Sequence, residues 1–184
     1  MIETTLDWIV NLFGLATLAI YSWALRAHFR SEGLSSQVKL LSLATTGLTL
    51  VLLASIWGYR QPVGSLASGL AVMAFSLALF FWAVSATRQA DLRHVFDEQQ
   101  PVGVVQDGPY AYVRHPFYVA YIMFWIGWSV ASWSPWSIIP TSGMALAYIM
   151  AARAEERRFE GTPFGESYRA YAQRTGRFLP RIIG

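Results

Sequence analysis

The chain has 184 residues, of which 54% are hydrophobic and only 14% are charged, whereas an ordinary globular domain carries about 25% charged residues. Its 14 basic and 11 acidic residues are too few to cover the water-facing surface of a soluble domain of this length. The absence of cysteine excludes disulfides and thiolate metal sites, and three histidines offer little for a metal centre. The composition therefore predicts a single membrane domain over residues 1–184, with no metal and no nucleic-acid partner.

The uncharged runs between the charged residues have the lengths of membrane crossings. They are Trp8–Leu25, Leu40–Tyr59, Gln61–Thr87 and Pro116–Ala152. Because about 20 helical residues cross the hydrocarbon core, each of the first three runs predicts one crossing. The fourth run is too long for one crossing and is interrupted at residues 132–137 by proline and serines, which suits a tight connection. The sequence thus predicts an all-α protein with five transmembrane helices, the last two forming a helical hairpin.

The basic residues predict the orientation of these crossings. With five spans, thirteen of the fourteen lysines and arginines share one side, and only Arg60 lies opposite. Since basic residues stay on the cytoplasmic side, the N-terminus is expected outside and the C-terminus in the cytoplasm. No basic segment precedes the first run, so we expect it to be retained rather than cleaved. Residues 1–87 then form three N-terminal spans, and residues 88–184 form the half that carries the polar segments.

Small and hydroxyl-bearing residues within the runs are interpreted as packing residues. Thr49 in the second run and Gly69 in the third are examples. Such residues let membrane helices approach closely and form hydrogen bonds across their interface.

The first informative polar segment covers residues 106–118. The sequence Asp107-Gly108-Pro109 is typical of a turn. Pro116 restrains His115 to an extended backbone just before the fourth run. An Arg114-His115 pair is thereby held at the membrane surface. Arg114 alone could be a headgroup anchor and His115 a span-start residue bonded to a carbonyl. The surrounding tyrosines favour a binding site instead; they are Tyr110, Tyr112, Tyr118 and Tyr121.

The second informative segment follows the last run. Glu155 and Glu156 continue an apolar helix into the interface, where a buried carboxylate requires a cationic partner. That partner is either a neighbouring arginine on the helix, such as Arg153 or Arg157, or the cationic group of a ligand. Farther along, residues 164–171 predict a short cytoplasmic amphipathic helix lying at the membrane surface.

Taken together, these blocks resemble a known family. The residues are Gly108-Pro109-Tyr110, Arg114-His115-Pro116-Phe117-Tyr118, the helical hairpin, Glu155-Glu156, and Phe164-Gly165 with Tyr168, Tyr171 and Arg177-Phe178-Leu179-Pro180. In order and spacing they are similar to the isoprenylcysteine carboxyl methyltransferases and the related bacterial phospholipid methyltransferases. The resemblance covers residues 106–180, while the first three runs are similar only in being hydrophobic.

The resemblance implies an integral membrane methyltransferase that uses S-adenosylmethionine (SAM) without a Rossmann domain. Carried onto matching positions, it implies a cofactor site made of Val105, Gln106, Tyr110, His115, Pro116, Tyr118, Glu155 and Glu156. This set suits SAM, because carboxylates and aromatic faces complement its ammonium, sulfonium and adenine. We expect Arg114 to orient an anionic acceptor or headgroup, and Glu156 or His115 to act as the base if the acceptor is an amine.

The acceptor is left open by the sequence. The resemblance implies a lipid, a lipidated molecule or another hydrophobic small molecule, methylated at oxygen, nitrogen or sulfur, with the protein located in the membrane and most simply in a bacterial inner membrane. Two alternatives are an NADPH-dependent membrane reductase of the sterol-reductase type, which shares an Arg-His-Pro block, and a non-catalytic transporter or assembly protein. Against a transporter, the uncharged runs hold no ionisable group in mid-membrane. The sequence does not indicate an oligomeric state.

Overall fold

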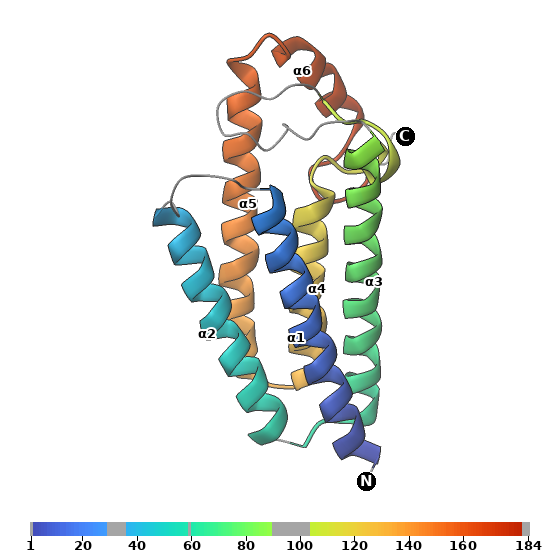
Figure 1. Cartoon of the computed structure of the whole chain (residues 1–184), viewed down its shortest axis with the longest axis vertical. Coiled ribbons are helices and arrows are strands. Elements are labelled where there is room, and N and C mark those ends of the chain that lie inside the picture. Colours follow the sequence, from blue (N-terminus) through green and yellow to red (C-terminus); the bar gives the residue numbers. More distant parts are fainter. Residues whose placement is uncertain (1, 29–35, 59, 90–103, 182–184) are drawn as a thin grey trace. The chain divides into compact units, whose positions relative to one another are not determined.

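The protein is all-α, as predicted, in the residues that the computed structural model describes, which are 2–28, 36–58, 60–89 and 104–181. Figure 1 shows the helices and labels the six α-helices. Their bounds are α1 Ile2–His28, α2 Ser36–Gly58, α3 Val63–Gln89, α4 Pro116–Ser132, α5 Ile138–Glu160 and α6 Gly165–Arg174, with short 3-10 helices η1 Gly108–Ala111 and η2 Pro135–Ser137. One isolated parallel β-bridge joins Val113 and Gly176.

The predicted apolar runs all form helices. Three helices within the described ranges are long and apolar enough to cross a membrane, with candidate spans Thr4–Ala24, Leu41–Gly58 and Val63–Arg88. Helix α4 is apolar but shorter, at 17 residues. Helix α5 is 23 residues long but ends in a charged segment, which lowers its overall hydropathy. The structure thus supports several membrane spans and leaves the predicted total of five as a prediction.

The chain groups into two compact units. Unit 1 comprises Met1–Ser76 and Ile122–Ala147, and unit 2 comprises Leu77–Tyr121 and Tyr148–Gly184. Helices α3, α4 and α5 each contribute residues to both units. The predicted division of the chain at residue 87 stays a prediction.

Unit 1 is held together by close helix contacts, as its small residues predict. A Cβ atom built on Gly69 of α3 would lie 2.4 Å from the carbonyl oxygen of Gly127 on α4, so only glycine permits this approach. The hydroxyls of Tyr21 and Ser76 are 2.7 Å apart and link α1 to α3. Thr49 behaves differently from the prediction, because its hydroxyl donates to the Thr45 carbonyl of its own helix.

The link between α4 and α5 is the predicted tight connection. The Trp133 amide donates to the Val130 carbonyl at 3.2 Å, and the Ser137 amide donates to Ser134 at 3.2 Å. Pro135 opens η2, where its missing N–H costs no hydrogen bond. The two helices therefore form a hairpin at residues 132–137.

Unit 2 contains the polar segments. Helix α6 follows the charged end of α5 (Figure 1), and the rings of Phe159 and Tyr168 stack there at 4.6 Å. Helix α6 buries Tyr168 and Tyr171 and exposes Arg169 and Arg174, which confirms the predicted amphipathic character. Its bounds are shifted a few residues toward the C-terminus relative to the predicted 164–171.

Candidate active site

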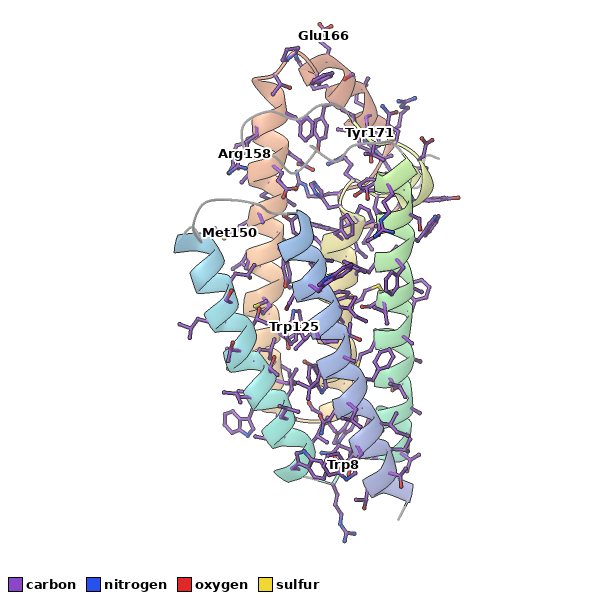
Figure 2. All side chains as sticks on the ribbon, viewed as in Figure 1. Trp8, Trp125, Met150, Arg158, Glu166 and Tyr171 are labelled. Atoms are coloured by element: carbon purple, nitrogen blue, oxygen red, sulfur yellow. The ribbon has the colours of Figure 1, made fainter. Side chains whose placement is uncertain are left out.

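The candidate site lies in unit 2, where the residues before α4 meet the charged end of α5 and the segment after α6. Figure 2 shows the side chains there and labels Arg158 on α5 and Tyr171 on α6. Three separate stretches of sequence supply the polar groups. Two backbone features hold these polar groups in place: a turn before α4 and the segment of residues 175–178 after α6.

The turn before α4 depends on a glycine. Gly108 has φ +60°, a conformation that side-chain-bearing residues rarely adopt, and a Cβ there would lie 3.0 Å from the Cβ of Ala86. The Tyr110 amide then donates to the Asp107 carbonyl, which closes η1. As predicted, Pro116 is the first residue of α4. Arg114 and His115 are therefore fixed between a rigid turn and a helix start.

The strap, residues 175–178, runs beside this segment. The Arg114 amide donates to the Gly176 carbonyl at 2.8 Å, and the His115 amide donates to the Arg177 carbonyl at 3.2 Å. A Cβ on Gly176 would lie 1.7 Å from the Leu179 carbonyl oxygen, so no other residue fits this bend. These bonds place the Arg177 side chain beside the end of α5.

Glu156 is the centre of a dense ionic cluster. Its carboxylate accepts hydrogen bonds from Arg114 Nε at 3.0 Å and from Arg177 Nε at 2.9 Å, and it lies 3.1 Å from His115 Nε2. Burial alone would raise the pKa of the Glu156 carboxyl, but the hydrogen bonds from His115, Arg177 and Arg114 outweigh it and hold that pKa well below its usual value. Glu156 therefore stays ionised near neutral pH and is a poor proton acceptor there.

Arg114 closes this cluster against the tail. Its side chain is only 11% exposed, and besides Glu156 its guanidinium donates to the carbonyls of Ala172 at 3.0 Å and of Thr175. These carbonyls belong to the C-terminal end of α6, where a cation is favourable. The geometry thus favours Arg114 as a positioning residue, while its predicted role in orienting an acceptor stays a prediction.

Glu155 occupies a different environment from its neighbour. Its side chain is 42% exposed, its carboxylate accepts a hydrogen bond from the Tyr118 hydroxyl, and its ion-pair partner within the described chain is His115, whose Nδ1 lies 3.6 Å away. Unlike Glu156, it pairs with no arginine among the residues that the structure describes. A half-exposed carboxylate with unused acceptor capacity is the kind of group that binds a ligand cation.

His115 lies between the two carboxylates. Its side chain is 9% exposed, and its ring stacks on Tyr118 with centroids 5.7 Å apart. Burial lowers the pKa of His115, but its interactions with the carboxylates of Glu155 and Glu156 raise it by more, so the pKa lies above the ordinary 6.5. The imidazole therefore titrates above the pH at which a free histidine would.

Aromatic rings form a wall beside Glu155. Tyr118 and Tyr148 stack at 5.7 Å, and Tyr121 contacts both, at 6.3 and 5.5 Å. Phe178 of the strap contacts the His115 ring at 5.9 Å. Flat aromatic faces next to one available carboxylate complement a ligand that carries an adenine, a sulfonium and an ammonium, so the residues fit SAM.

The structure brings five of the predicted site residues into one cluster. Arg114, His115, Tyr118, Glu155 and Glu156 contact one another as described above. Gln106 is exposed, and its side-chain oxygen accepts a hydrogen bond from Arg174 Nη2 at 3.1 Å. The preceding residue, Val105, is buried. The Tyr110 carbonyl accepts from the Tyr171 hydroxyl at 2.7 Å, and burial raises the pKa of Tyr110, which keeps its hydroxyl protonated.

The observed partners of Glu156 come from other segments of the chain, and the alternative of a ligand cation stays a prediction. The local pairing with Arg153 or Arg157 is wrong, because the ion-pair partners of Glu156 come from residues 114, 115 and 177. Sequence reasoning also missed Arg177 and Tyr148 as site residues. The signal for Arg177 was its place in the Arg-Phe-Leu-Pro block combined with the need of the carboxylate pair for cations. No sequence pattern marks Tyr148, which is one of several aromatic residues in an apolar run.

Comparison with protein families adds the decisive finding. The family model for phospholipid methyltransferase matches residues 64–167. The chain belongs to this family. The matched range is more than half of the chain, and it includes α3, which the predicted resemblance from residue 106 had left out. A comparison with curated proteins found no match.

Membership in this family settles the general activity. Phospholipid methyltransferases of this type are integral membrane enzymes that use SAM to methylate a membrane lipid-like acceptor. The alternatives of an NADPH-dependent reductase and of a non-catalytic membrane protein are therefore set aside. The matched range holds Arg114, His115, Tyr118 and both carboxylates, and it ends before the strap.

Proposed function

We propose that this methyltransferase acts on the primary or partly methylated amine of a phospholipid headgroup. The observation that carries the proposal is the half-exposed Glu155 carboxylate beside a wall of tyrosines, within a chain of the phospholipid methyltransferase family. A site that handles two cations, the sulfonium of the donor and the ammonium form of the acceptor, needs a negative group that the protein's own arginines do not neutralise.

In this proposal Glu155 binds the ammonium of SAM, and the faces of Tyr118 and His115 lie against its cationic and aromatic parts. Tyr110 and the backbone at Val105 and Gln106 complete the pocket. Pro116 contributes by fixing the direction in which His115 points. Glu156 does not touch the cofactor, because Arg114, His115 and Arg177 surround its carboxylate.

The chemical step needs orientation more than acid–base catalysis. SAM supplies an electrophilic methyl group on a sulfonium sulfur that leaves as a neutral thioether. An acceptor nitrogen held in line with that methyl group would form the C–N bond as the C–S bond breaks, so the protein would contribute mainly positioning and exclusion of water. An ammonium acceptor must first lose a proton. In this proposal neutral His115 accepts that proton. Glu156 is a weaker base, because its pKa is lowered.

The same proposal includes the arrangement in the membrane. Five crossings, with α4 and α5 as the last two, would place the N-terminus outside and the site in the cytoplasm, where SAM is made. The distribution of basic residues supports this orientation. A bacterial inner membrane and a functional half at residues 88–184 agree with it. Attaching a reporter enzyme that is active only in the cytoplasm to the C-terminus tests this orientation.

The acceptor is tested with purified protein and radiolabelled SAM. The panel contains phosphatidylethanolamine, its monomethyl and dimethyl derivatives, phosphatidylcholine as a blocked control, and a prenylated cysteine that offers a carboxylate. Label in the amine lipids alone supports the proposal. Label in the prenylated cysteine alone contradicts the amine assignment, and label in none of them with retained SAM binding points to a hydrophobic acceptor outside both classes.

A further inference from the structure

Three arginines lie exposed on the charged end of α5. They are Arg153, Arg157 and Arg158, called here the arginine ridge. No hydrogen bond or ion pair joins any of them to another described residue. The other arginines that follow α5 are all engaged: Arg177 on Glu156, Arg174 on Gln106, and Arg169 and Arg181 on backbone carbonyls.

We propose that the arginine ridge binds the phosphate groups of anionic phospholipids at the headgroup level of the bilayer. This proposal is independent of which acceptor the enzyme methylates. A guanidinium presents parallel N–H donors that match phosphate oxygens, and it is more weakly hydrated than an ammonium. Three such groups on one helix end, without a partner among the described residues, constitute a surface for an anion.

The position of the ridge along α5 matches an amphiphile. Arg153 and Arg157 are four residues apart and share one face of the helix, separated by about 6 Å along its axis. Met150, one turn earlier, is 60% exposed and apolar; Figure 2 labels Met150 and Arg158 on this helix. An exposed apolar side chain followed by guanidinium groups suits an acyl chain and the phosphate to which it is linked.

The carboxylates of α5 do not neutralise the ridge in the part of the helix whose side chains are described. Glu155 is held by Tyr118 and His115, and Glu156 by Arg114, His115 and Arg177. Both engage groups on other elements rather than the adjacent arginines. These two carboxylates therefore leave the positive charge of the ridge uncompensated.

The expected strength follows from the attraction of basic residues to anionic membranes. Each arginine near such a surface strengthens binding by about fivefold, so three together contribute up to about 100-fold, less at high salt. We expect phosphatidylglycerol to raise the unfolding temperature of the detergent-solubilised protein above that in phosphatidylcholine. Added salt should reduce this difference.

The test compares two triple variants with the same loss of charge. The ridge variant is Arg153→Gln/Arg157→Gln/Arg158→Gln, and the control is Arg60→Gln/Arg88→Gln/Arg181→Gln, at exposed positions outside the ridge. The proposal expects the phosphatidylglycerol-induced shift to persist in the control and to disappear in the ridge variant. A full shift in the ridge variant, or an equal loss in both, overturns it. An equal shift with inorganic phosphate overturns the lipid source, because a free anion would then suffice.

If the ridge triple variant does not fold, the single variant Arg157→Gln replaces it. Its phospholipid retained after purification is then measured against that of Arg60→Gln. A smaller proportion of anionic lipid with Arg157→Gln supports the ridge, and equal proportions contradict it.

Discussion

Replacing each of the two adjacent glutamates by glutamine separates a structural carboxylate from a ligand-binding one. In Glu156→Gln, the charge that Arg114, His115 and Arg177 share is lost, although one amide oxygen can still accept. Hydrogen bonds to charged groups contribute about 1.5–3 kcal/mol each, and the 34% exposure of Arg177 reduces its share. We therefore expect Glu156→Gln to destabilise the protein by about 2–4 kcal/mol, which lowers the unfolding temperature by about 5–15 °C.

Glu155→Gln should give the opposite pattern. Its 42% exposed side chain contributes little to stability, less than about 1 kcal/mol, but loss of a charged contact to the SAM ammonium should weaken binding by about 10- to 100-fold. Thermal unfolding in detergent measures the first effect and titration calorimetry with SAM the second. Glu166→Gln, at an exposed position on α6, is the matched control. If Glu155→Gln unfolded early and bound SAM normally, the assignment of the two carboxylates would be wrong.

Four further predictions follow from the geometry. Gly176→Ala places a Cβ 1.7 Å from a backbone carbonyl oxygen, so the two backbone hydrogen bonds of the strap should be lost. We expect the protein to be destabilised by about 1–3 kcal/mol and to bind SAM more weakly by calorimetry. Unchanged stability and unchanged SAM binding contradict the role of the strap. Because the pKa of Glu156 is lowered in the folded state, its stabilising effect is present above the ordinary pKa of 4.5 and is lost as the pH falls toward the folded pKa; the acid-induced fall in unfolding temperature should be steeper for the wild type than for Glu156→Gln. Because the pKa of His115 is raised, kcat/KM for an amine acceptor should increase with pH through a midpoint above 6.5; His115→Gln should remove this limb, and a limb that persists belongs to the acceptor amine. Gly127→Ala places a Cβ 2.8 Å from the facing carbonyl, so it should lower the unfolding temperature while Gly143→Ala, at an open position, leaves it unchanged; equal effects would argue against close helix packing there.

The helices could be predicted from sequence because charge is excluded from apolar helices in lipid. The uncharged runs therefore predict the helices. Pro116 and Pro135 each begin a helix, because proline lacks the N–H that a position inside a helix requires. The limits of α1 and α5 were less predictable. Both helices continue into charged residues, since a helix needs hydrogen bonds and not hydropathy to persist beyond the membrane.

The composition of the candidate site was predictable and its pairing was not. Arg114, His115 and the carboxylates stood out because such groups are costly at a membrane surface. Their partners depend on the strap, whose path is set by backbone hydrogen bonds to residues 114 and 115 and by the bend at Gly176. A single sequence contains no periodic signal for an extended segment that lies beside another through two hydrogen bonds. The sequence therefore identifies Arg177 as a motif residue but does not predict that it pairs with Glu156.

The different roles of Glu155 and Glu156 follow from helix geometry. Consecutive residues on an α-helix point about 100° apart, so two adjacent carboxylates face different surroundings, although His115 contacts both. One of them faces Arg114 and the strap, where three cationic groups hold it ionised, and the other faces Tyr118 with little more than an imidazole against it. Because His115 lies between the two, we expect the charge of Glu156 to act on Glu155 through the protonation state of His115. In the proposed function Glu156 anchors the strap and Glu155 binds the ligand, so Glu156→Gln should alter the pH dependence of SAM binding as well as the stability of the fold.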